Sequence, residues 1–147
     1  MKLATILIRI GACLDARFWA KAQPDLETAW SECKRSDWML WLIAQTTLDQ
    51  DDPRLRLMAC DFAEAALIYV PAGEDRPRQA IEVARRFAAG EATREEMAAA
   101  WAAAWAAAGA AAGAAALAAA GGAQSDIIRR YFPECPEIKP ELLHKAV

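Results

Sequence analysis

Histidine and closely spaced cysteines are nearly missing from this 147-residue sequence, and their scarcity excludes several kinds of site. The chain has one histidine, His144, and four cysteines, no two of which form a CxxC pair. A zinc site needs Cys or His ligands at short, regular spacing, so the sequence predicts no metal and no cofactor. The cysteines are also too scattered for a disulfide framework. We therefore expect reduced, mostly buried thiols in a cytoplasmic protein.

A strong charge of one sign is also missing. The chain has 17 basic and 20 acidic residues, for a net charge of −3, which argues against general binding to nucleic acid. No signal peptide is expected either, because Arg9 interrupts the short apolar run after Met1. Charged residues still make up 25% of a chain that is 56% apolar, and this composition predicts one globular domain.

Charge is wholly absent from Met97 to Leu117, where the sequence reads MAAAWAAAWAAAGAAAGAAAL. Roughly 20 apolar residues are long enough to cross a bilayer, but alanine is only weakly hydrophobic and the segment lacks the leucine and isoleucine that drive insertion. Alanine has the highest helix propensity, and its small side chain lets neighbouring helices approach closely. The segment therefore predicts a buried central helix and no membrane span.

Apolar residues elsewhere recur at three- and four-residue steps, which is typical of helices. This spacing runs from Leu3 to Phe18, with a break expected at Gly11. A short strand over residues 5–10 is the alternative for the first part of that stretch.

Polar residues of the kind that cap helices mark several expected boundaries. Ser36 is expected to cap an apolar helix over residues 37–45. Thr93 is followed three positions later by Glu96, which is the spacing of a capping box at the start of the alanine-rich helix. Because no strand pattern stands out, the predicted fold class is all-α.

The predicted architecture is a single-domain helical bundle around a central Ala-rich helix. Residues 1–132 form the helical domain in this interpretation. Residues 133–147 form an irregular, proline-containing C-terminal tail, since proline cannot continue a helix or a sheet ladder.

Four arginines lie in or beside one expected helix, and they have two interpretations. As a solvated face, they would pair with Glu82, which lies four residues from both Arg78 and Arg86. As an anion site, they would use Arg76, which precedes a helix N-terminus where backbone amides favour phosphate or carboxylate. The second interpretation makes Arg76, Arg78 and Arg85 candidate binding residues for a nucleotide or an acidic partner.

The six tryptophans are many for this length, and most are expected in the core. Trp38 and Trp41 lie three residues apart and so share one side of their helix. Tryptophan is a strong anchor in protein interfaces, so these two are candidate binding residues on an exposed face.

Clustered acidic residues raise the question of catalysis or metal binding. Asp49, Asp51 and Asp52 lack the glycine and distal glutamate of an EF-hand, so we expect them to cap a loop. Asp61 and Glu64 have no histidine or nucleophile nearby in sequence, so surface or ion-pair roles are expected. The sequence therefore predicts no catalytic residues and no enzyme.

The stretch from Arg76 to Thr93, RPRQAIEVARRFAAGEAT, leads directly into the alanine array. It resembles the alanine-rich, all-helical immunity proteins of polymorphic toxin systems and their relatives in bacteriophage genomes. The segments GAC at 11–13, DWMLWL at 37–42 and SDIIR at 125–129 also resemble the phage-borne relatives. The resemblance covers most of residues 3–132 and implies an all-helical protein without established catalytic residues.

Taken with that resemblance, the absence of a catalytic motif predicts a non-enzymatic protein of immunity or phage counter-defence type. Such a protein binds a toxin or a host defence protein and blocks it by stoichiometric occlusion, in the host cytoplasm if it is phage-encoded. Two alternatives remain open at this stage. One is sequestration of a small anionic, nucleotide signal, and the other is a structural or assembly component of a phage, in which the chain would form a homo-oligomer.

Overall fold

The computed structural model describes residues 2–107 and 122–144 of the chain. All regular elements within that part are helices, apart from one isolated antiparallel bridge between Thr46 and Ile138. The helices are α1 (Leu3–Arg9), α2 (Leu14–Ala20), α3 (Leu26–Glu32), α4 (Ser36–Ala44), α5 (Pro53–Ala66), the 3-10 helix η1 (Leu67–Tyr69), α6 (Arg76–Ala88), α7 (Arg94–Ala107), α9 (Gly122–Tyr131) and α10 (Pro140–Leu143). The prediction of an all-α, single-domain fold is confirmed.

The expected break in the first helical stretch occurs at Gly11. Its φ of 82° lies in the left-handed region that favours glycine, a common way to end a helix. The amide of Ala12 donates to the carbonyl of Leu7 at 2.9 Å and closes α1. The alternative of a strand over residues 5–10 is wrong, because α1 occupies most of that stretch.

The two predicted caps have different outcomes. Thr93 and Glu96 form the expected capping box: the amide of Glu96 donates to Thr93 Oγ1 at 3.1 Å, and the amide of Thr93 donates to Glu96 Oε2 at 2.7 Å. The cap predicted at Ser36 is wrong, since Arg35 takes the N-cap position and Ser36 is the first helical residue. The Ser36 hydroxyl instead donates to Gln124 Oε1 at 3.0 Å, joining α4 to α9.

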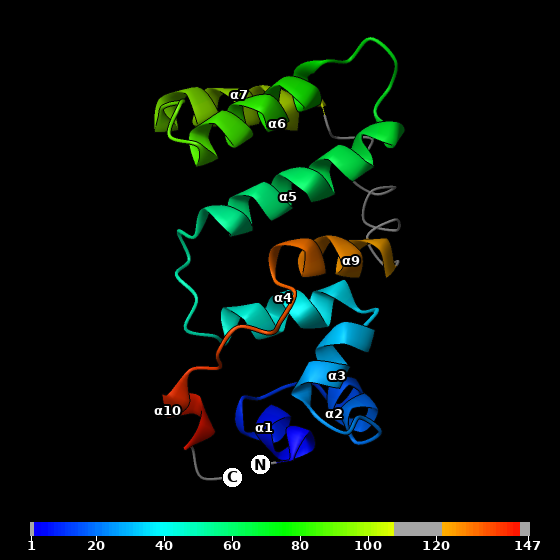
Figure 1. The fold of residues 1–147 in the computed structure, drawn as a ribbon. Coiled ribbons are helices and arrows are strands. Elements are labelled where there is room, and N and C mark those ends of the chain that lie inside the picture. Colours follow the sequence, from blue (N-terminus) through cyan, green and yellow to red (C-terminus); the bar gives the residue numbers. More distant parts are fainter. Residues whose placement is uncertain (1, 108–121, 145–147) are drawn as a thin grey trace.

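The helices are arranged as a stack of layers (Figure 1). α6 and α7 lie at one end, α5 follows, α9 and α4 come next, and α1–α3 lie at the other end. The centre of the core is where α9 passes between α5 and α4, and it holds the fully buried side chains of Met39, Ile128 and Phe132. The indole N–H of Trp30 donates to the carbonyl of Phe132 at 2.9 Å and so ties α3 to the end of α9.

The described part of the alanine-rich segment does not lie at the centre of the stack, which corrects the prediction of a central helix. α7 lies at one end and packs mainly against α6, and the side chain of Trp101 is 56% exposed. Alanine buries little apolar area per residue, so the larger side chains of α1–α5 and α9 form the core instead. Residues 108–121 lie outside the described part of the chain. None of the helices in the described residues has the length and hydropathy needed to cross a membrane.

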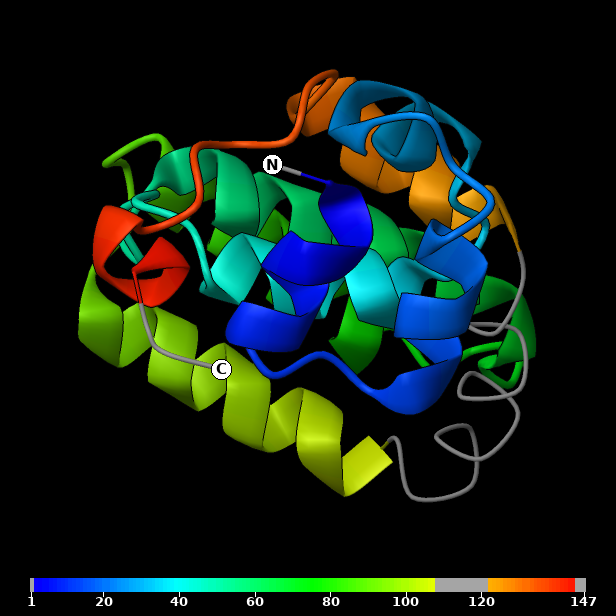
Figure 2. The same ribbon diagram turned by 90° about the horizontal axis from the view of Figure 1, so that it is seen from below.

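The chain after Phe132 runs back along the stack towards α1. The amide of Thr47 donates to the carbonyl of Glu137 at 2.7 Å, and the Ile138 side chain is only 5% exposed. Seen from below, α1 lies across α4 and α10 lies beside α1 (Figure 2). This C-terminal segment therefore braces the end of the molecule that α1 and α4 form.

Candidate functional site

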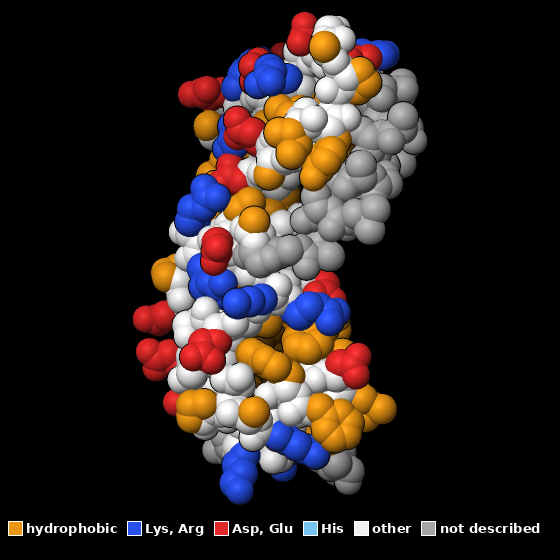
Figure 3. All heavy atoms as spheres, turned by 90° about the vertical axis from the view of Figure 1, so that its right-hand side faces the viewer, with side chains coloured by type: hydrophobic (Ala, Val, Ile, Leu, Met, Phe, Trp, Pro, Cys, Tyr) orange, Lys and Arg blue, Asp and Glu red, His pale blue; other side chains and the backbone are white. Residues whose placement is uncertain are grey.

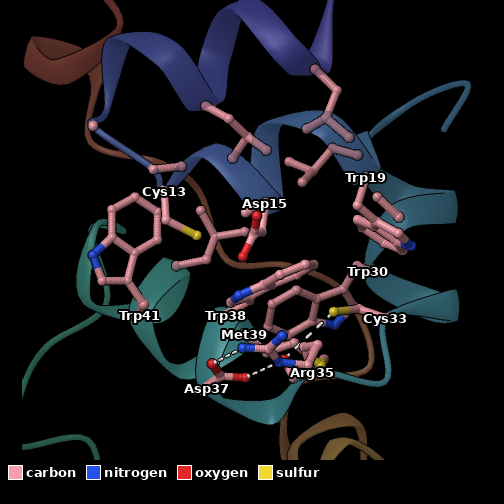
Figure 4. A pocket seen from close by; sticks show the side chains of 18 residues that line it. Cys13, Asp15, Trp19, Trp30, Cys33, Arg35, Asp37, Trp38, Met39 and Trp41 are labelled. Carbon is pink, nitrogen blue, oxygen red and sulfur yellow. Dashed lines mark hydrogen bonds and ion pairs between the residues drawn. The ribbon is translucent and has the colours of Figure 1, made fainter. Parts of the chain in front are cut away.

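A pocket with a volume of about 490 Å³ lies between α1, α2, α3 and α4 (Figure 4). That size falls within the range of known small-ligand sites, about 300–1,000 Å³. Its wall is mainly apolar and includes four of the six tryptophans: Trp19, Trp30, Trp38 and Trp41.

The tryptophans reach the pocket from three different helices. Trp19 comes from α2, Trp30 from α3, and Trp38 and Trp41 from α4. Trp30 is only 3% exposed and is fixed by its hydrogen bond to the chain after α9, so it forms a rigid back wall. The rings of Trp19 and Trp38 contact each other with centroids 5.9 Å apart and planes tilted by 55°. The predicted pair, Trp38 and Trp41, thus lines one shared cavity.

One arginine and one aspartate form an ion pair at the mouth of the pocket. Arg35 donates to Asp37 twice, from Nε at 2.8 Å and from Nη2 at 2.7 Å. The same guanidinium lies over the ring of Trp38, 4.5 Å from its centroid. Hydrogen bonding from Arg35 lowers the pKa of Asp37, and hydrogen bonding to Asp37 raises the pKa of Arg35, so both groups are charged at neutral pH.

Asp15 and Cys13 complete the polar part of the lining, and both are exposed. In Figure 4 the Asp15 carboxylate points into the pocket above Trp38, with Trp41 on one side and Trp19 on the other. The Asp15 side chain makes no hydrogen bond or ion pair within residues 2–107 and 122–144, although its charge acts on the Arg35 guanidinium from a longer distance. With Asp37 matched by Arg35, the lining therefore carries one net negative charge.

The arginines predicted as binding residues lie elsewhere, on α6, and two of them already face carboxylates (Figure 1). Arg76 donates from Nε to Glu74 Oε1 at 2.7 Å and makes a second, shorter contact to the same carboxylate. These hydrogen bonds from Arg76 lower the pKa of Glu74 to about 2. Arg78 is exposed on the first turn of α6. An anion at Arg76 would thus have to displace a carboxylate that is ionised at neutral pH.

Arg85 is held by two carboxylates of α5. Its Nη2 lies 2.7 Å from Asp61 Oδ1 and 2.6 Å from Glu64 Oε2, so the ion-pair interpretation of those two acids is confirmed. Asp61 also accepts from the hydroxyl of Tyr131 at 2.8 Å. Partial burial raises the pKa of Asp61, but the hydrogen bonds from Arg85 and Tyr131 outweigh it and the net shift is downward. These contacts connect α5, α6 and α9, and they stabilise the packing of these three helices.

The aspartates before α5 cap a loop, as predicted. Asp49 Oδ1 accepts from the amide of Asp51 at 2.9 Å, and Asp52 Oδ1 accepts from the amide of Arg54 at 2.9 Å. In the part of the chain that the structure describes, no group of three or more His, Cys, Asp or Glu side chains is placed to hold a metal ion.

Sequence reasoning missed Arg35 and Asp15 as site residues. Neither belongs to a motif, and both line the pocket because the rings of Trp19 on α2 and Trp38 on α4 are in contact. The one usable signal was Arg35 standing three residues before Trp38, which fits a guanidinium stacked on an indole. Comparison of the chain with protein-family models, with curated proteins and with solved structures found no match.

Proposed function

We propose that this chain is a non-enzymatic binding protein of immunity or phage counter-defence type. It blocks a toxin or a host defence protein by stoichiometric occlusion, and the pocket between α1 and α4 is the centre of its binding surface. The observation that supports this proposal most is the cluster of four tryptophans around one surface pocket. Tryptophans in preformed pockets are the residues that dominate binding energy in protein interfaces.

The surface around the pocket has the composition of a protein interface. Leu14 and Phe18 on α2 are 65% and 64% exposed, and Ile8 on α1 is 38% exposed. In Figure 3 hydrophobic side chains reach the surface over the part of the molecule that α1–α4 form, with charged side chains beside them. An apolar centre with a polar rim is typical of interfaces between proteins.

The test is a capture experiment with matched tryptophan variants. The wild-type chain, Trp38→Ala and Trp101→Ala are each expressed with a tag in the host. Proteins that co-purify with the tagged chain at a one-to-one molar ratio are identified, and their activity is assayed. Trp101 is a suitable control because it is exposed on α7, at the opposite end of the stack. We expect wild type and Trp101→Ala to retain a partner that Trp38→Ala binds at least about tenfold more weakly.

The purified partner should lose its activity at a one-to-one molar ratio with the wild-type chain. Inactivation by far less than one equivalent would indicate turnover and contradict an occlusion mechanism. Equal capture by Trp38→Ala, with an unchanged circular dichroism spectrum, would place the binding surface elsewhere.

A further inference from the structure

Three charged side chains line the pocket, and two of them, Arg35 and Asp37, form an ion pair with each other. Arg35 directs both arms of its guanidinium at Asp37 and covers the ring of Trp38. Asp15 also lines the pocket, on the other side of the Trp38 ring in Figure 4, and its side chain forms no ion pair in the described residues, although its charge acts on Arg35 from a longer distance. While the pocket is open, water solvates the Asp15 carboxylate, since the side chain is exposed.

Covering the pocket changes the situation of Asp15. A partner that closes the pocket removes water from this carboxylate, and a desolvated charge without a direct ion-pair partner is strongly unfavourable. An apolar group from the partner does not offset the desolvation of Asp15, and an acidic group adds electrostatic repulsion to it. A positive charge from the partner offsets it, so the lining selects for a cation.

The aromatic wall favours the same chemistry. Tryptophan faces attract cations through their quadrupole, more strongly than other aromatic rings do. The stack of Arg35 on Trp38, 4.5 Å from the ring centroid, shows that this wall accepts a planar guanidinium. In Figure 4 the Asp15 carboxylate points towards Trp38, with Trp19 on one side and Cys13 and then Trp41 on the other, so an entering guanidinium would meet indole surface and carboxylate together.

We infer that the pocket binds an arginine side chain of the partner protein, which pairs with Asp15 and packs between Trp19 and Trp41. Guanidinium suits this site better than ammonium because it is planar, stacks on aromatic faces and pairs with a carboxylate through two hydrogen bonds. The net charge of −3 on the whole chain favours approach of a basic surface. This inference rests on the proposed function, since it names the group that the blocked partner supplies.

The test uses two pentapeptides that differ only in charge. Acetyl-Gly-Gly-Arg-Gly-Gly-amide and the same peptide with citrulline in place of arginine are titrated against the full chain by calorimetry and tryptophan fluorescence. Citrulline keeps the shape and most of the hydrogen-bonding groups of arginine without its charge. We expect the arginine peptide to bind at least about tenfold more tightly than the citrulline peptide.

Two acid-to-amide variants locate the effect. Asp15→Asn should reduce the affinity of the arginine peptide to that of the citrulline peptide. Glu95→Gln removes the same charge from an exposed position on α7, at the far end of the stack, and should leave both affinities unchanged. Circular dichroism confirms that each variant is folded.

Equal binding of the two peptides, absence of binding to either, or an equal loss in both variants would overturn the inference. Tighter binding of choline than of the arginine peptide would also overturn it, because the pocket would then be a site for a small organic cation. These results are independent of the capture experiment. Loss of the partner in Trp38→Ala without arginine selectivity keeps the proposed function and rejects only the ligand chemistry.

Discussion

Trp30 has a structural role that distinguishes it from the other pocket tryptophans. Its ring is 3% exposed, and its indole N–H satisfies the carbonyl of Phe132, 102 positions away in the chain. Trp19, Trp38 and Trp41 are only partly buried. The pocket therefore combines one fixed wall with three side chains that a ligand can reach.

Replacing Trp30 with phenylalanine should destabilise the fold. The change leaves the buried Phe132 carbonyl without its donor and removes ring volume from the core, and together these effects cost about 2–4 kcal/mol. Urea denaturation measures the loss. Trp101→Phe serves as control and should change the free energy of unfolding by less than about 0.5 kcal/mol, since Trp101 is 56% exposed. Equal effects of the two substitutions would contradict the anchoring role of Trp30.

At the scale of elements, Asp61 is the main polar link between helices. It accepts from Arg85 on α6 and Tyr131 on α9 while lying on α5 itself. Its pKa is lowered below the ordinary value of 3.8 in the folded chain. Ionised Asp61 therefore stabilises the fold at pH values above 3.8, and this contribution is lost as the pH falls through the lower, folded-state pKa.

Asp61→Asn should lower the free energy of unfolding by about 1–3 kcal/mol at pH 7, because it removes charge-assisted hydrogen bonds at a mostly buried site. The difference from wild type should shrink as the pH falls below 3.8 and through the lower, folded-state pKa of Asp61, where wild-type Asp61 also becomes neutral. Urea denaturation across this pH range is the measurement. Asp126→Asn is the control, because the Asp126 side chain is 75% exposed and pairs with Arg129 of the same helix. A gap that does not change with pH would reject the ion-pair explanation.

Helix boundaries could be predicted from sequence where the signal was local. The break at Gly11 and the capping box at Thr93 depend on residues within a few positions of each other, and both are present. Ser36 failed as a cap because its hydroxyl bonds to Gln124, 88 positions away. The place of each helix in the stack depends on such distant partners, which spacing along the chain does not reveal.

The candidate site was predictable to the same limited extent. Trp38 and Trp41 share a helix side, so their joint position followed from periodicity. Asp15 and Arg35 line the same pocket because Trp19 of α2 and Trp38 of α4 contact each other across it. Of the arginines in the anion-site interpretation, Arg76 pairs with Glu74, and Arg85 pairs with Asp61 and Glu64.

For the whole molecule, the C-terminal segment is more ordered than the predicted irregular tail, because it pairs at Ile138 and forms the short helix α10. Ile138 is 5% exposed and pairs with Thr46 next to the end of α4. Ile138→Ala should cost about 2–4 kcal/mol by leaving a cavity. Ile68→Ala, at a position that is 78% exposed, should cost less than about 0.5 kcal/mol. Thermal denaturation of both variants gives their melting temperatures, and we expect that of Ile138→Ala to be the lower. Equal melting temperatures would contradict a stabilising role of the C-terminal segment.

The central position of α9 has a consequence for how the chain reaches its native state. α4 and α5 are synthesised early, yet the faces they turn towards each other are covered by a helix that begins only at residue 122. A nascent chain therefore exposes apolar surface on both helices until Gly122–Tyr131 has emerged, and the contacts that cover this surface are long-range. The core should therefore form late, in one step, when α9 inserts between α4 and α5. Before that step, we expect chaperones to bind the exposed apolar surfaces of α4 and α5.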